Sequence, residues 1–566
     1  MNTNTKSNET LTTTHESCNI MVDLLQEYGV NDVIVSPGSR NAPIIIALSR
    51  CDEITKHIIV DERSAAFAAI GIAQQTDTPV AIVCTSGTAV LNYAPAIAEA
   101  FYQQLPLIVI SADRPHEWID QNDSQTLKQP GILANIVKQS CNIPAQCFRT
   151  DDLWYCNRII NEALQCATNH SAGPVHINIE LGEPLYERKP VQQSLARKIE
   201  KHSPYISAES LAQHSDIINS HKKVLILASM HPKCQLASIL NNISGNNIVV
   251  IGEIIANCNS SDRIFHNIDR LFTEIDENLW ASLRPDLLIT FGGAPVSRLA
   301  KTFLRKLNGV EHWRIGCDSG IIDTMQNLTQ KINVTPLQFF TNITVKHNDS
   351  SYYSQWSDLA SKANASLHAY INQCPWSDLK AMSIIMQHIP TSQINIQISN
   401  GSSIRYADLL GTPSHYEGSV HCNRGVSGID GSTSTALGAS MVSSCNTLLI
   451  TGDMSFSYDL GGLASQYNSQ RLKIIVLCNG GGGIFRFING PSQLPQFEDY
   501  FEVHQDIPTE KYAHAFGFDH FHATDEESLT SALNQLFASH KPAILSVHTN
   551  NMTSADTLRK YYNRNK

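Results

Sequence analysis

The feature that most constrains the fold is an alternation of short β-branched runs with longer amphipathic stretches, repeated along all 566 residues. Runs at residues 33–35, 80–84 and 107–111 each stop at Gly, Ser, Thr or Pro and give way to a helical pattern. This alternation predicts an α/β fold of mainly parallel sheets flanked by helices. Because the chain is too long for one hydrophobic core, we expect three domains.

Three sets of such runs divide the chain. The first set closes at residues 174–179, after which the polar, Pro-containing stretch 183–204 predicts a linker. The second set has runs at 224–228, 248–251 and 287–291, and the polar segment 347–356 ends it. The third set has runs near Val420 and at 447–451, 474–478 and 543–547. We therefore expect domains at residues 1–188, 189–355 and 356–566, and their similar sizes suggest duplication of a fold.

The composition narrows the class of partner. With 41 Lys and Arg against 52 Asp and Glu, the net charge of -11 disfavours a nucleic-acid partner, so arginine clusters must hold any anionic ligand. The 14 cysteines form no C-x-x-C pair and no zinc-type cluster, as expected for reduced thiols in a cytosol. Residues 1–17 lack the apolar core of a signal peptide, and no run is long enough to span a membrane. We expect a soluble, cytoplasmic protein.

Two turns in the third set carry oxygen ligands suited to a hard cation. The run 448–451 leads into Gly452-Asp453, and the run 474–478 leads into Asn479 and four consecutive glycines. In open α/β sheets ligands bind at the carboxyl ends of the strands. The 26 positions between Asp453 and Asn479 leave room for a crossover that brings both turns together. The sequence therefore predicts a Mg²⁺ site made of Asp453, Asn479 and a glycine carbonyl, assigned to Gly481.

Each turn also has a simpler interpretation. A Gly-Asp pair at a strand end is often only a turn, and four glycines can form a flexible loop. A dinucleotide loop would need G-x-G-x-x-G after the first strand and an acid about 20 residues further on. Here the glycines are consecutive, and Phe485, Phe487 and Ile488 follow at once, which disfavours a nicotinamide cofactor.

The pair of turns resembles the motif of the thiamine-diphosphate enzymes, Gly-Asp-Gly followed about twenty-five residues later by Asn-Asn. The chain has Met454 at the third position and Gly480 at the last, so both side-chain ligands are retained. In that family a glutamate from the neighbouring subunit bonds the aminopyrimidine ring of the cofactor, and the matching acid is Glu62. Its proton would favour the imino tautomer, whose nitrogen takes the C2 proton of the thiazolium. Without the other motifs, Glu62 would be interpreted as a helix N-terminal acid that complements the helix dipole.

Further motifs narrow the resemblance to one branch of this family. They are Ser36-Pro37-Gly38-Ser39-Arg40-Asn41, Thr85-Ser86-Gly87-Thr88-Ala89, Ala112-Asp113-Arg114-Pro115, Asn423-Arg424-Gly425 and Gly428-Ile429-Asp430-Gly431. In this order, from about Ser36 to Phe487, they resemble the menaquinone-pathway synthases that make 2-succinyl-5-enolpyruvyl-6-hydroxy-3-cyclohexene-1-carboxylate. The resemblance covers nearly the whole chain and is least distinctive in the middle domain.

This resemblance implies a transferase with pyrimidine-binding, middle and diphosphate-binding domains. Its cofactors would be thiamine diphosphate and Mg²⁺, or Mn²⁺ in place of Mg²⁺. It would decarboxylate 2-oxoglutarate, release CO2 and add the resulting carbanion to isochorismate. The assembly would be a homodimer, or a dimer of dimers, with active sites at the subunit interface.

Both implied substrates are dicarboxylates, for which arginine is a planar, bidentate partner. By resemblance, one group of residues shapes the isochorismate side: Ser39, Arg40, Arg114 and Gln125. A second group binds substrate carboxylates: Asn400, Arg405 and Arg424. Of these residues, Ser39, Arg40, Gln125, Arg405 and Arg424 are predicted to be catalytic together with Glu62, and Asn400 also to contact the cofactor.

Three apolar residues belong to the resemblance as well. Ile429 would hold the cofactor in its bent shape, while Ile484 and Phe485 would line the site, although all three are equally well explained as core. Where some relatives carry a Lys-Arg pair in the middle domain, this chain has Ser297-Arg298, so Arg298 is the expected acceptor contact there.

Three alternatives remain open. Another thiamine-diphosphate lyase, such as an acetolactate-synthase-like enzyme with pyruvate as donor, would share Glu62, Asp453 and Asn479 but would not need the arginines. A non-catalytic nucleotide-binding or scaffolding protein of the same fold would have no use for Glu62. A flavin or nicotinamide oxidoreductase would carry a bound chromophore.

Overall fold

The computed structural model describes residues 10–201, 208–232, 236–258, 262–318, 320–346, 348–390, 394–413, 416–487 and 490–564. The start of the polar N-terminal segment, the end of the predicted linker, His347 and Ile488 lie outside these residues. Two compact units make up the chain: Met1–Ser203 with Leu437–Val442, and Pro204–Ala436 with Ser443–Lys566. Within the described residues, three six-stranded sheets and a two-stranded ribbon with flanking helices confirm the predicted α/β class.

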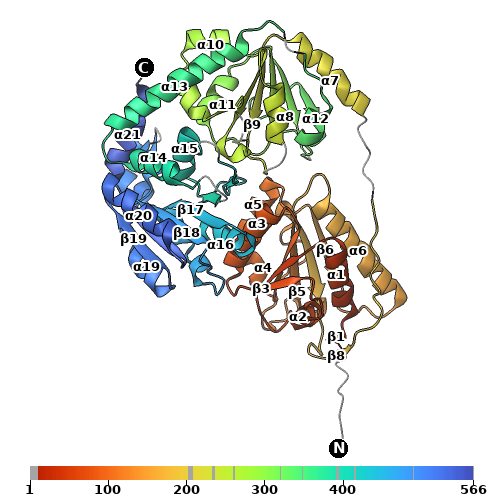
Figure 1. The fold of residues 1–566 in the computed structure, drawn as a ribbon. Coiled ribbons are helices and arrows are strands. Elements are labelled where there is room, and N and C mark those ends of the chain that lie inside the picture. Colours follow the sequence, from red (N-terminus) through yellow and green to blue (C-terminus); the bar gives the residue numbers. More distant parts are fainter. Residues whose placement is uncertain are drawn as a thin grey trace, which may run out of the picture. The chain divides into compact units, whose positions relative to one another are not determined.

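The sheet of the first unit is parallel throughout and lies between two layers of helices. Its strand order is β3 (Thr55–Ile58), β2 (Asp32–Val35), β4 (Val80–Cys84), β5 (Leu107–Asp113), β7 (Val175–Glu180), β6 (Gln139–Ile143). One face shares a core with α1 (Glu16–Glu27), α2 (Ala42–Ser49) and α6 (Thr150–Thr168) (Figure 1). The helices α3 (Glu62–Thr76) and α5 (Ala94–Gln103) pack against each other, and α3 contacts β2, β4 and β5. Strands covered on both faces read as continuous apolar runs, which explains why β2, β4 and β5 were predicted correctly.

Part of the predicted linker is held against the first unit. β8 (Arg188–Pro190) pairs antiparallel with β1 (Leu11–Thr13). Further on, Asn157 Nδ2 of α6 donates to the Arg197 carbonyl at 3.0 Å, and Tyr28 Oη donates to the Ile199 carbonyl at 3.1 Å. These side chains satisfy backbone groups of a stretch that has no further strand partner of its own among the described residues. The domain boundary at residue 188 stays a prediction.

The first sheet of the second unit has the order β11 (Phe265–His266), β10 (Ile248–Gly252), β9 (Val224–Ala228), β12 (Leu287–Phe291), β13 (Glu311–Ile315), β14 (Gln330–Ile332). Alternate residues of β9 face opposite layers. Val224, Ile226 and Ala228 share a core with α7 (Ala208–Ser220), α8 (Leu236–Ile243) and α12 (Pro336–Asn342). Leu225 and Leu227 share another with α9 (Ile268–Thr273), α10 (Glu277–Leu283), α11 (Arg298–Leu304) and α13 (Tyr352–Gln373).

The second sheet of this unit has the order β16 (Val420–His421), β15 (Ile394–Ile398), β17 (Asn446–Gly452), β18 (Leu472–Cys478), β20 (Ala543–His548), β19 (Asp519–Ala523). One face of it shares a core with α14 (Asp378–His388), α15 (Ser402–Leu410), α20 (Glu526–Ala538) and α21 (Asn551–Asn563). The remaining helices are α4 (Ala89–Asn92), α16 (Ser432–Val442), α17 (Asp453–Tyr458), α18 (Gly483–Phe487) and α19 (Thr509–Ala515). Short turns of 3-10 helix lie at His116–Trp118, Ala134–Ile136, Ile254–Ala256, Leu460–Ala464 and Pro491–Gln493, and a turn of π-helix at Glu498–Glu502.

Strand order separates the middle sheet from the other two. In the first and third sheets the strands of each set run second, first, third, fourth, sixth, fifth across the sheet. In the middle sheet they run third, second, first, fourth, fifth, sixth. The suggested duplication therefore agrees with the outer two sheets but not with the middle one. In the outer sheets the order reverses between β2 and β4 and between β15 and β17, which is where ligands of open α/β sheets bind.

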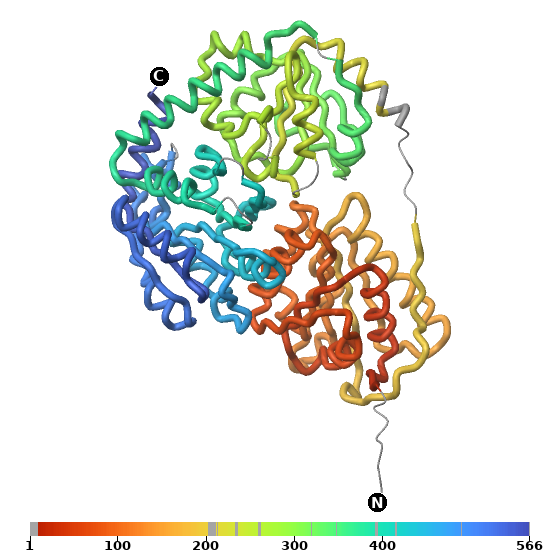
Figure 2. The backbone as a smooth tube through the Cα atoms, viewed as in Figure 1, coloured from red at the N-terminus to blue at the C-terminus, as the bar shows by residue number. Residues whose placement is uncertain are grey.

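Helix α13 joins the two cores of the second unit. Tyr352 and Trp356 lie in the core of the middle sheet, whereas Leu367 and Ile371 lie in that of the last sheet. Figure 2 shows this helix, in green, running from one to the other. The predicted boundary at residue 355 falls inside it, because one continuous helix serves both cores.

Two polar contacts reinforce this connection. Arg270 of α9 donates from Nε and Nη2 to the Leu409 carbonyl at 3.0 and 2.9 Å, at the C-terminal end of α15. Tyr562 Oη donates to Asp269 Oδ2 at 2.9 Å. The last carbonyls of a helix lack hydrogen-bond donors within the helix. Arg270 therefore supplies hydrogen-bond donors to the C-terminal end of α15.

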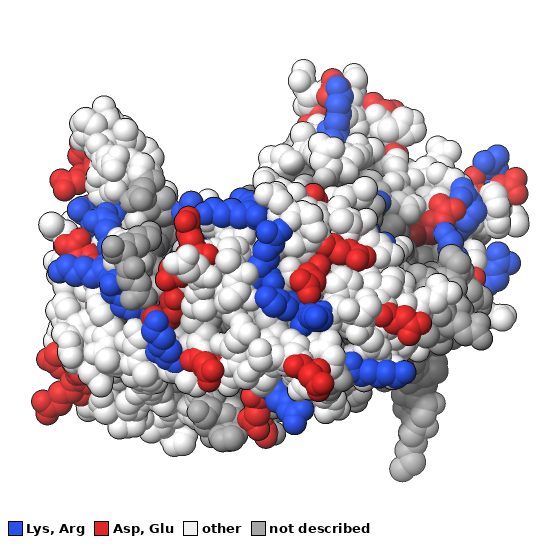
Figure 3. Space-filling view, turned by 90° about the horizontal axis from the view of Figure 1, so that it is seen from above, with Lys and Arg blue, Asp and Glu red and all other residues white. Residues whose placement is uncertain are grey.

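Figure 3 shows how charged side chains are distributed on one face of the molecule. On the face shown in Figure 3, acidic and basic side chains are interspersed. Among the helices that the structure describes, none is both long enough and apolar enough to cross a membrane.

The Arg270 contact makes a prediction about stability. Arg270→Met should leave buried carbonyls unsatisfied, at a cost of about 3 kcal/mol, and should lower the thermal unfolding midpoint by about 4 °C. Differential scanning fluorimetry measures this shift. As a control, Arg158→Met removes a guanidinium from a solvent-accessible pair with Glu162 and should shift the midpoint by about 1 °C at most. Equal shifts for both variants would contradict this account of Arg270.

Candidate functional site

The predicted cation ligands meet at the carboxyl ends of neighbouring strands. β17 and β18 pair in parallel, and Asp453 and Asn479 follow them directly. Asp453 Oδ1 accepts from the Met454 amide at 2.7 Å, and Oδ2 accepts from the Gly480 amide at 2.8 Å. The expected crossover that brings both turns together is confirmed.

Asp453 is a buried carboxylate, and its hydrogen bonds offset only part of the cost of burying its charge. Burial raises its pKa to about 6, while the amides of Gly480 and Met454 act against this rise and the nearby Asp378 adds to it. A bound cation would favour the ionised form of such a group. Within the described residues no three or more His, Cys, Asp or Glu form a cluster that could hold a metal ion. One carboxylate is, however, what Mg²⁺ needs when phosphate oxygens and water complete its shell.

Asp378, which the sequence did not indicate, orients Asn479. It is the first residue of α14, is fully buried, and its Oδ2 accepts from Asn479 Nδ2 at 2.9 Å. The Thr549 hydroxyl also donates to this carboxylate. Asn479 Oδ1 is buried without a hydrogen-bond partner among the described residues. The amide is therefore turned so that its oxygen is available, as a cation ligand requires.

The four glycines follow Asn479 because the backbone there is crowded. Gly480 has φ +87°, and a Cβ on it would lie 2.7 Å from His504 Cε1. A Cβ on Gly481, which has φ +150°, would lie 2.7 Å from the Glu502 carbonyl oxygen. The Gly481 carbonyl accepts from the Gly483 amide at 2.8 Å, which leaves one lone pair for a cation. Together Asp453, Asn479 and Gly481 fit Mg²⁺ that also binds a diphosphate.

A second group gathers around Asn400, at the end of β15. Its Nδ2 donates to the Gly428 carbonyl at 2.9 Å and to the Asn423 carbonyl, and its Oδ1 accepts from Arg424 Nη1 at 3.2 Å. Ile429, which is 41% exposed, presents its carbonyl to the Ser455 hydroxyl at 2.6 Å. Asn400 thus holds two points of the single loop between β16 and α16, which carries both Arg424 and Ile429. Ile484 is half-buried and Phe485 exposed, both in α18.

The three predicted arginines of this unit share one region. Burial lowers the pKa of Arg405, and the nearby charges of Arg424 and Arg298 lower it further. Arg424 Nε is buried and has no hydrogen-bond partner in the part of the chain described. Arg298 opens α11, where Ser297 Oγ caps the helix by accepting from the Ala300 amide at 3.0 Å. These positive charges lie close together, and Arg424 Nε has no acceptor among the described residues. A carboxylate ligand would neutralise part of this charge.

Two buried acids near these arginines were also not predicted from the sequence. Glu253 Oε1 accepts from the amides of Val296 and Ser297 at 2.6 and 2.9 Å, and burial raises its pKa to about 7. Asp408 Oδ1 accepts from the Ile254 amide at 2.9 Å. Glu253 follows Gly252 at the end of β10, the same Gly-acid pattern as Gly452-Asp453, and that signal could have revealed it.

In the first unit, Glu62 is the first residue of α3. Asp61 caps this helix by accepting from the Arg63 amide at 3.1 Å. Glu62 is half-buried, and desolvation is the main cause that raises its pKa. The position agrees both with a helix N-terminal acid and with a carboxyl that keeps its proton more readily than usual.

The other predicted residues of this unit lie along the same sheet edge. Arg40 follows β2 and is 7% exposed, and its Nη1 donates to the Leu181 carbonyl at 2.9 Å and approaches Glu183 to 3.3 Å. Arg114 follows β5 and pairs with Asp123 at 2.8 Å. Burial and then the charge of Arg114 lower the pKa of Arg40, so the two guanidiniums lie close together. Ser39 and Gln125 are exposed.

Gln129 connects the turn after β4 with the end of β5, next to Arg114, and the sequence did not indicate it. This fully buried side chain accepts from the Gly87 amide at 2.7 Å and donates to the Ala112 carbonyl at 3.1 Å. A Cβ on Gly87 would lie 3.6 Å from the Gln125 backbone. Nothing in the sequence distinguishes Gln129 from a surface glutamine, because its burial depends on loops from two other strands.

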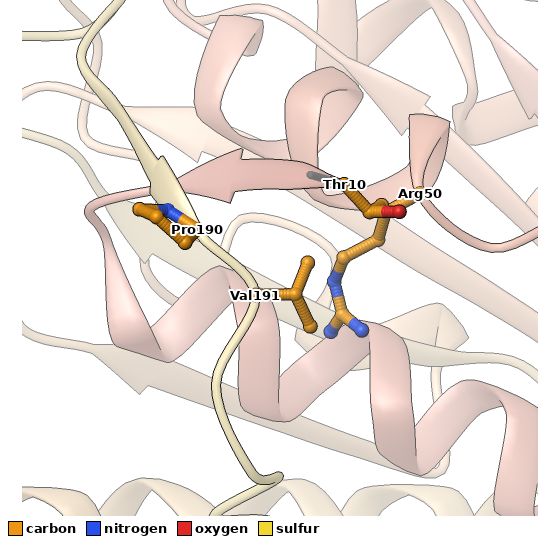
Figure 4. Close-up of a pocket in the computed structure, with 4 residues that line it drawn as sticks. All are labelled: Thr10, Arg50, Pro190 and Val191. Carbon is orange, nitrogen blue, oxygen red and sulfur yellow. The ribbon is translucent and has the colours of Figure 1, made fainter. Parts of the chain in front are cut away.

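A cavity of about 410 Å³ lies elsewhere in the first unit. It is lined by Thr10, Arg50, Pro190 and Val191 beside the β1–β8 ribbon (Figure 4). Arg50 ends α2, which returns from the carboxyl end of β2 toward the start of β3. The cavity therefore lies at the amino edge of the sheet and contains none of the predicted site residues.

The comparisons with known proteins agree with this chemistry. Residues 16–132 match the model of the thiamine pyrophosphate enzyme N-terminal TPP binding domain, and residues 403–547 match that of the C-terminal TPP binding domain. The fold, the strand-end ligands and both matches together define a thiamine pyrophosphate enzyme.

Curated relatives narrow the class. The chain is 38% identical over 558 residues to the 2-succinyl-5-enolpyruvyl-6-hydroxy-3-cyclohexene-1-carboxylate synthase of Porphyromonas gingivalis, covering 96% of each chain. It is 38% identical over 546 residues to that of Flavobacterium psychrophilum, covering 96% of this chain and 97% of the relative. For that of Cytophaga hutchinsonii the identity is 35% over 545 residues, covering 95% and 97%. The chain belongs to the 2-succinyl-5-enolpyruvyl-6-hydroxy-3-cyclohexene-1-carboxylate synthase family, as the motifs predicted.

Glu253 makes a prediction about pH. Since burial raises its folded-state pKa from 4.5 to about 7, the protonated form is favoured on folding, and its ionisation costs stability as the pH rises through this range. Glu253→Gln keeps an acceptor for the two amides but cannot ionise. The variant should equal the wild type near pH 4 and exceed it near pH 8 by about 3 kcal/mol. Thermal midpoints of both proteins between these pH values provide the measurement, and parallel curves would contradict it.

Proposed function

We propose that this chain joins 2-oxoglutarate and isochorismate with loss of CO2, in menaquinone biosynthesis, using thiamine diphosphate and Mg²⁺. The observation that carries this proposal is that Asn479 Oδ1 accepts no hydrogen bond among the described residues and lies beside the buried Asp453. The same unit contains the group of Arg298, Arg405 and Arg424. The first feature suits a cation with a diphosphate. The second suits a dicarboxylate. The cytoplasmic location stays a prediction.

The cation would be held by Asp453, Asn479 and Gly481. Asp378 supports this role, because it binds the Asn479 amide nitrogen and leaves the oxygen free to coordinate. The two amides on Asp453 prevent rotation of its carboxylate. Mn²⁺ has similar ligand preferences and could replace Mg²⁺. When bound, thiamine diphosphate supplies the electron sink that accepts the electron pair left by decarboxylation of a 2-oxo acid.

Glu62 would hold the proton that activates the cofactor. A carboxyl whose pKa is raised by burial can donate a hydrogen bond to a ring nitrogen and recover its proton later. Ile429, Ile484 and Phe485 would exclude water and support the cofactor, which protects the reactive carbon from protonation.

The arginines would separate this reaction from that of an acetolactate-synthase-like lyase. Arg405, Arg424 and Asn400 would bind substrate carboxylates, since Arg424 already bonds Asn400 and keeps Nε unpaired among the described residues. Arg298 would contribute from α11 in place of the Lys-Arg pair of some relatives. Ser39, Arg40, Arg114 and Gln125 would receive the acceptor, although Arg40 would have to exchange part of its contact with Glu183 for the substrate. Pyruvate has only one carboxylate, so it would leave some of these arginine charges without a partner.

Two copies of the chain would build each site. In this arrangement Glu62 of one copy acts on the cofactor that Asp453 and Asn479 of the other copy anchor. A homodimer is the smallest closed assembly that permits this, and a dimer of dimers repeats it.

Loss of the Glu62 proton should separate binding from turnover. With thiamine diphosphate, Mg²⁺ and 2-oxoglutarate present, the wild type should consume isochorismate, as followed by the loss of its absorbance. Glu62→Gln should reduce kcat by roughly 10²- to 10⁴-fold while cofactor binding, measured by calorimetry, changes little. Asp453→Ala serves as the matched variant that should lose cofactor binding itself. Wild-type turnover in Glu62→Gln would remove this residue from the mechanism.

Mixing two inactive variants tests the shared site. In a mixed dimer of Glu62→Gln and Asp453→Ala chains, one of the two sites has both native residues. Unfolding, mixing and refolding in equal amounts should therefore restore about a quarter of wild-type activity, because half the dimers are mixed and each has one intact site. Either variant refolded alone is the control. No recovery, with mixed dimers demonstrated by differential tagging, would place both residues in the same chain's site.

A further inference from the structure

The glycine run after β18 is held by a segment that the cofactor motif does not include. The Glu502 carbonyl accepts from the Gly482 amide at 2.7 Å, and the Gln505 amide donates to the Gly480 carbonyl at 3.1 Å. The segment containing Glu502 and Gln505 therefore pairs with the backbone of the loop that carries the cation ligand Gly481.

Close packing makes this pairing specific. A Cβ on Gly482 would lie 2.8 Å from the Phe501 carbonyl oxygen, just as one on Gly481 would meet the carbonyl of Glu502. The two backbones approach so closely that only glycine fits at these positions. Any movement of Glu502 would then be transmitted to the loop.

The Glu502 side chain connects this segment to two helices. Its carboxylate accepts from Arg486 Nε at 2.7 Å, is also contacted by Arg486 Nη2, and accepts from Asn551 Nδ2. Arg486 lies in α18, which begins at the last of the four glycines, and Asn551 begins α21. Glu502 is 7% exposed, so this bidentate pair is largely removed from water. The Arg486 guanidinium also lies 4.9 Å from the centre of the Phe497 ring.

These contacts surround the predicted cofactor contacts. Phe485, one residue before Arg486, packs against Phe501 with ring centres 6.0 Å apart. Asn551 Oδ1 would lie 2.6 Å from a Cβ on Gly483. The Glu502 carboxylate thus connects the helix carrying Ile484 and Phe485 with the start of α21, while the backbone carbonyl of the same residue holds the loop.

We propose that Glu502 is a positioning residue, which holds Gly480 to Gly483 and Phe485 in the arrangement that binds the cation and the diphosphate. It touches neither ligand and acts through Arg486, Asn551 and the Gly482 amide. The inference rests on the proposed function, in that it assumes a diphosphate cofactor at Asp453 and Asn479. Residues that orient metal ligands commonly change metal affinity by about 10- to 100-fold when they are replaced.

The test is cofactor binding by the full-length apoprotein, measured by calorimetry with thiamine diphosphate in saturating Mg²⁺. Glu502→Gln should weaken binding by about 10-fold or more. The control is Asp318→Asn, which breaks another buried arginine pair, with Arg314 at 3.0 Å in the middle domain, and should bind as the wild type does. Thermal midpoints without cofactor should fall by similar amounts in both variants. An unchanged dissociation constant in folded Glu502→Gln would overturn the proposal, as would an equal loss in Asp318→Asn.

A double variant separates a joint action from two independent losses. If Glu502 and Arg486 act as one unit, then Glu502→Gln with Arg486→Gln should bind no more weakly than the worse single variant. Additive losses would overturn the proposal. Should Glu502→Gln fail to fold, as judged by circular dichroism, Asn551→Ala removes one contact of the same carboxylate and should weaken cofactor binding by a smaller factor. A wild type that does not bind thiamine diphosphate would refute the proposed function and this inference with it, whereas failure of the variants alone leaves the proposed function standing.

Discussion

The site of the second unit depends on burying the Asp453 carboxylate between two parallel strand ends. Burial disfavours the charged form, and two backbone amides offset only part of this cost, so the carboxyl keeps a pKa near 6. This cost of burial favours a cation there. Two neighbouring features also favour a cation there. Asp378 turns the Asn479 amide so that its oxygen is available, and the glycines let a second segment approach the loop.

A similar balance of charge organises the group of arginines in the same unit. Arg298 and Arg424 lie close enough to Arg405 to lower its pKa. The buried acids Glu253 and Asp408 lie near Arg424. Glu253 accepts from the two amides that precede α11 and thereby fixes the start of the helix that carries Arg298. The middle sheet thus contributes to this region through a helix start, and the long helix α13 ties it to the last sheet.

Central strands were predicted more reliably than edge strands. β4, β9 and β12 were predicted to the residue, because both faces are covered and the sequences read as unbroken apolar runs. The edge strand β14 was missed, since polar residues such as Gln330 interrupt its apolar pattern. The central strand β15 was missed as well, because Asn395 and Gln397 interrupt its apolar pattern, and the Asn395 amide finds the Thr447 hydroxyl only in the folded sheet.

By itself, the sequence determined the α/β class, the family and the pair Asp453 and Asn479, because strand runs, glycines and ligand spacing are local along the chain. Only the tertiary structure decided which groups support them. Asp378 lies 101 positions from Asn479, and Gln129 lies 42 from Gly87. Glu502 meets both Arg486 and Asn551, although the three belong to different elements. Such contacts form where separate strands and helices end at one edge, and no local pattern encodes a meeting of side chains that the fold alone brings together.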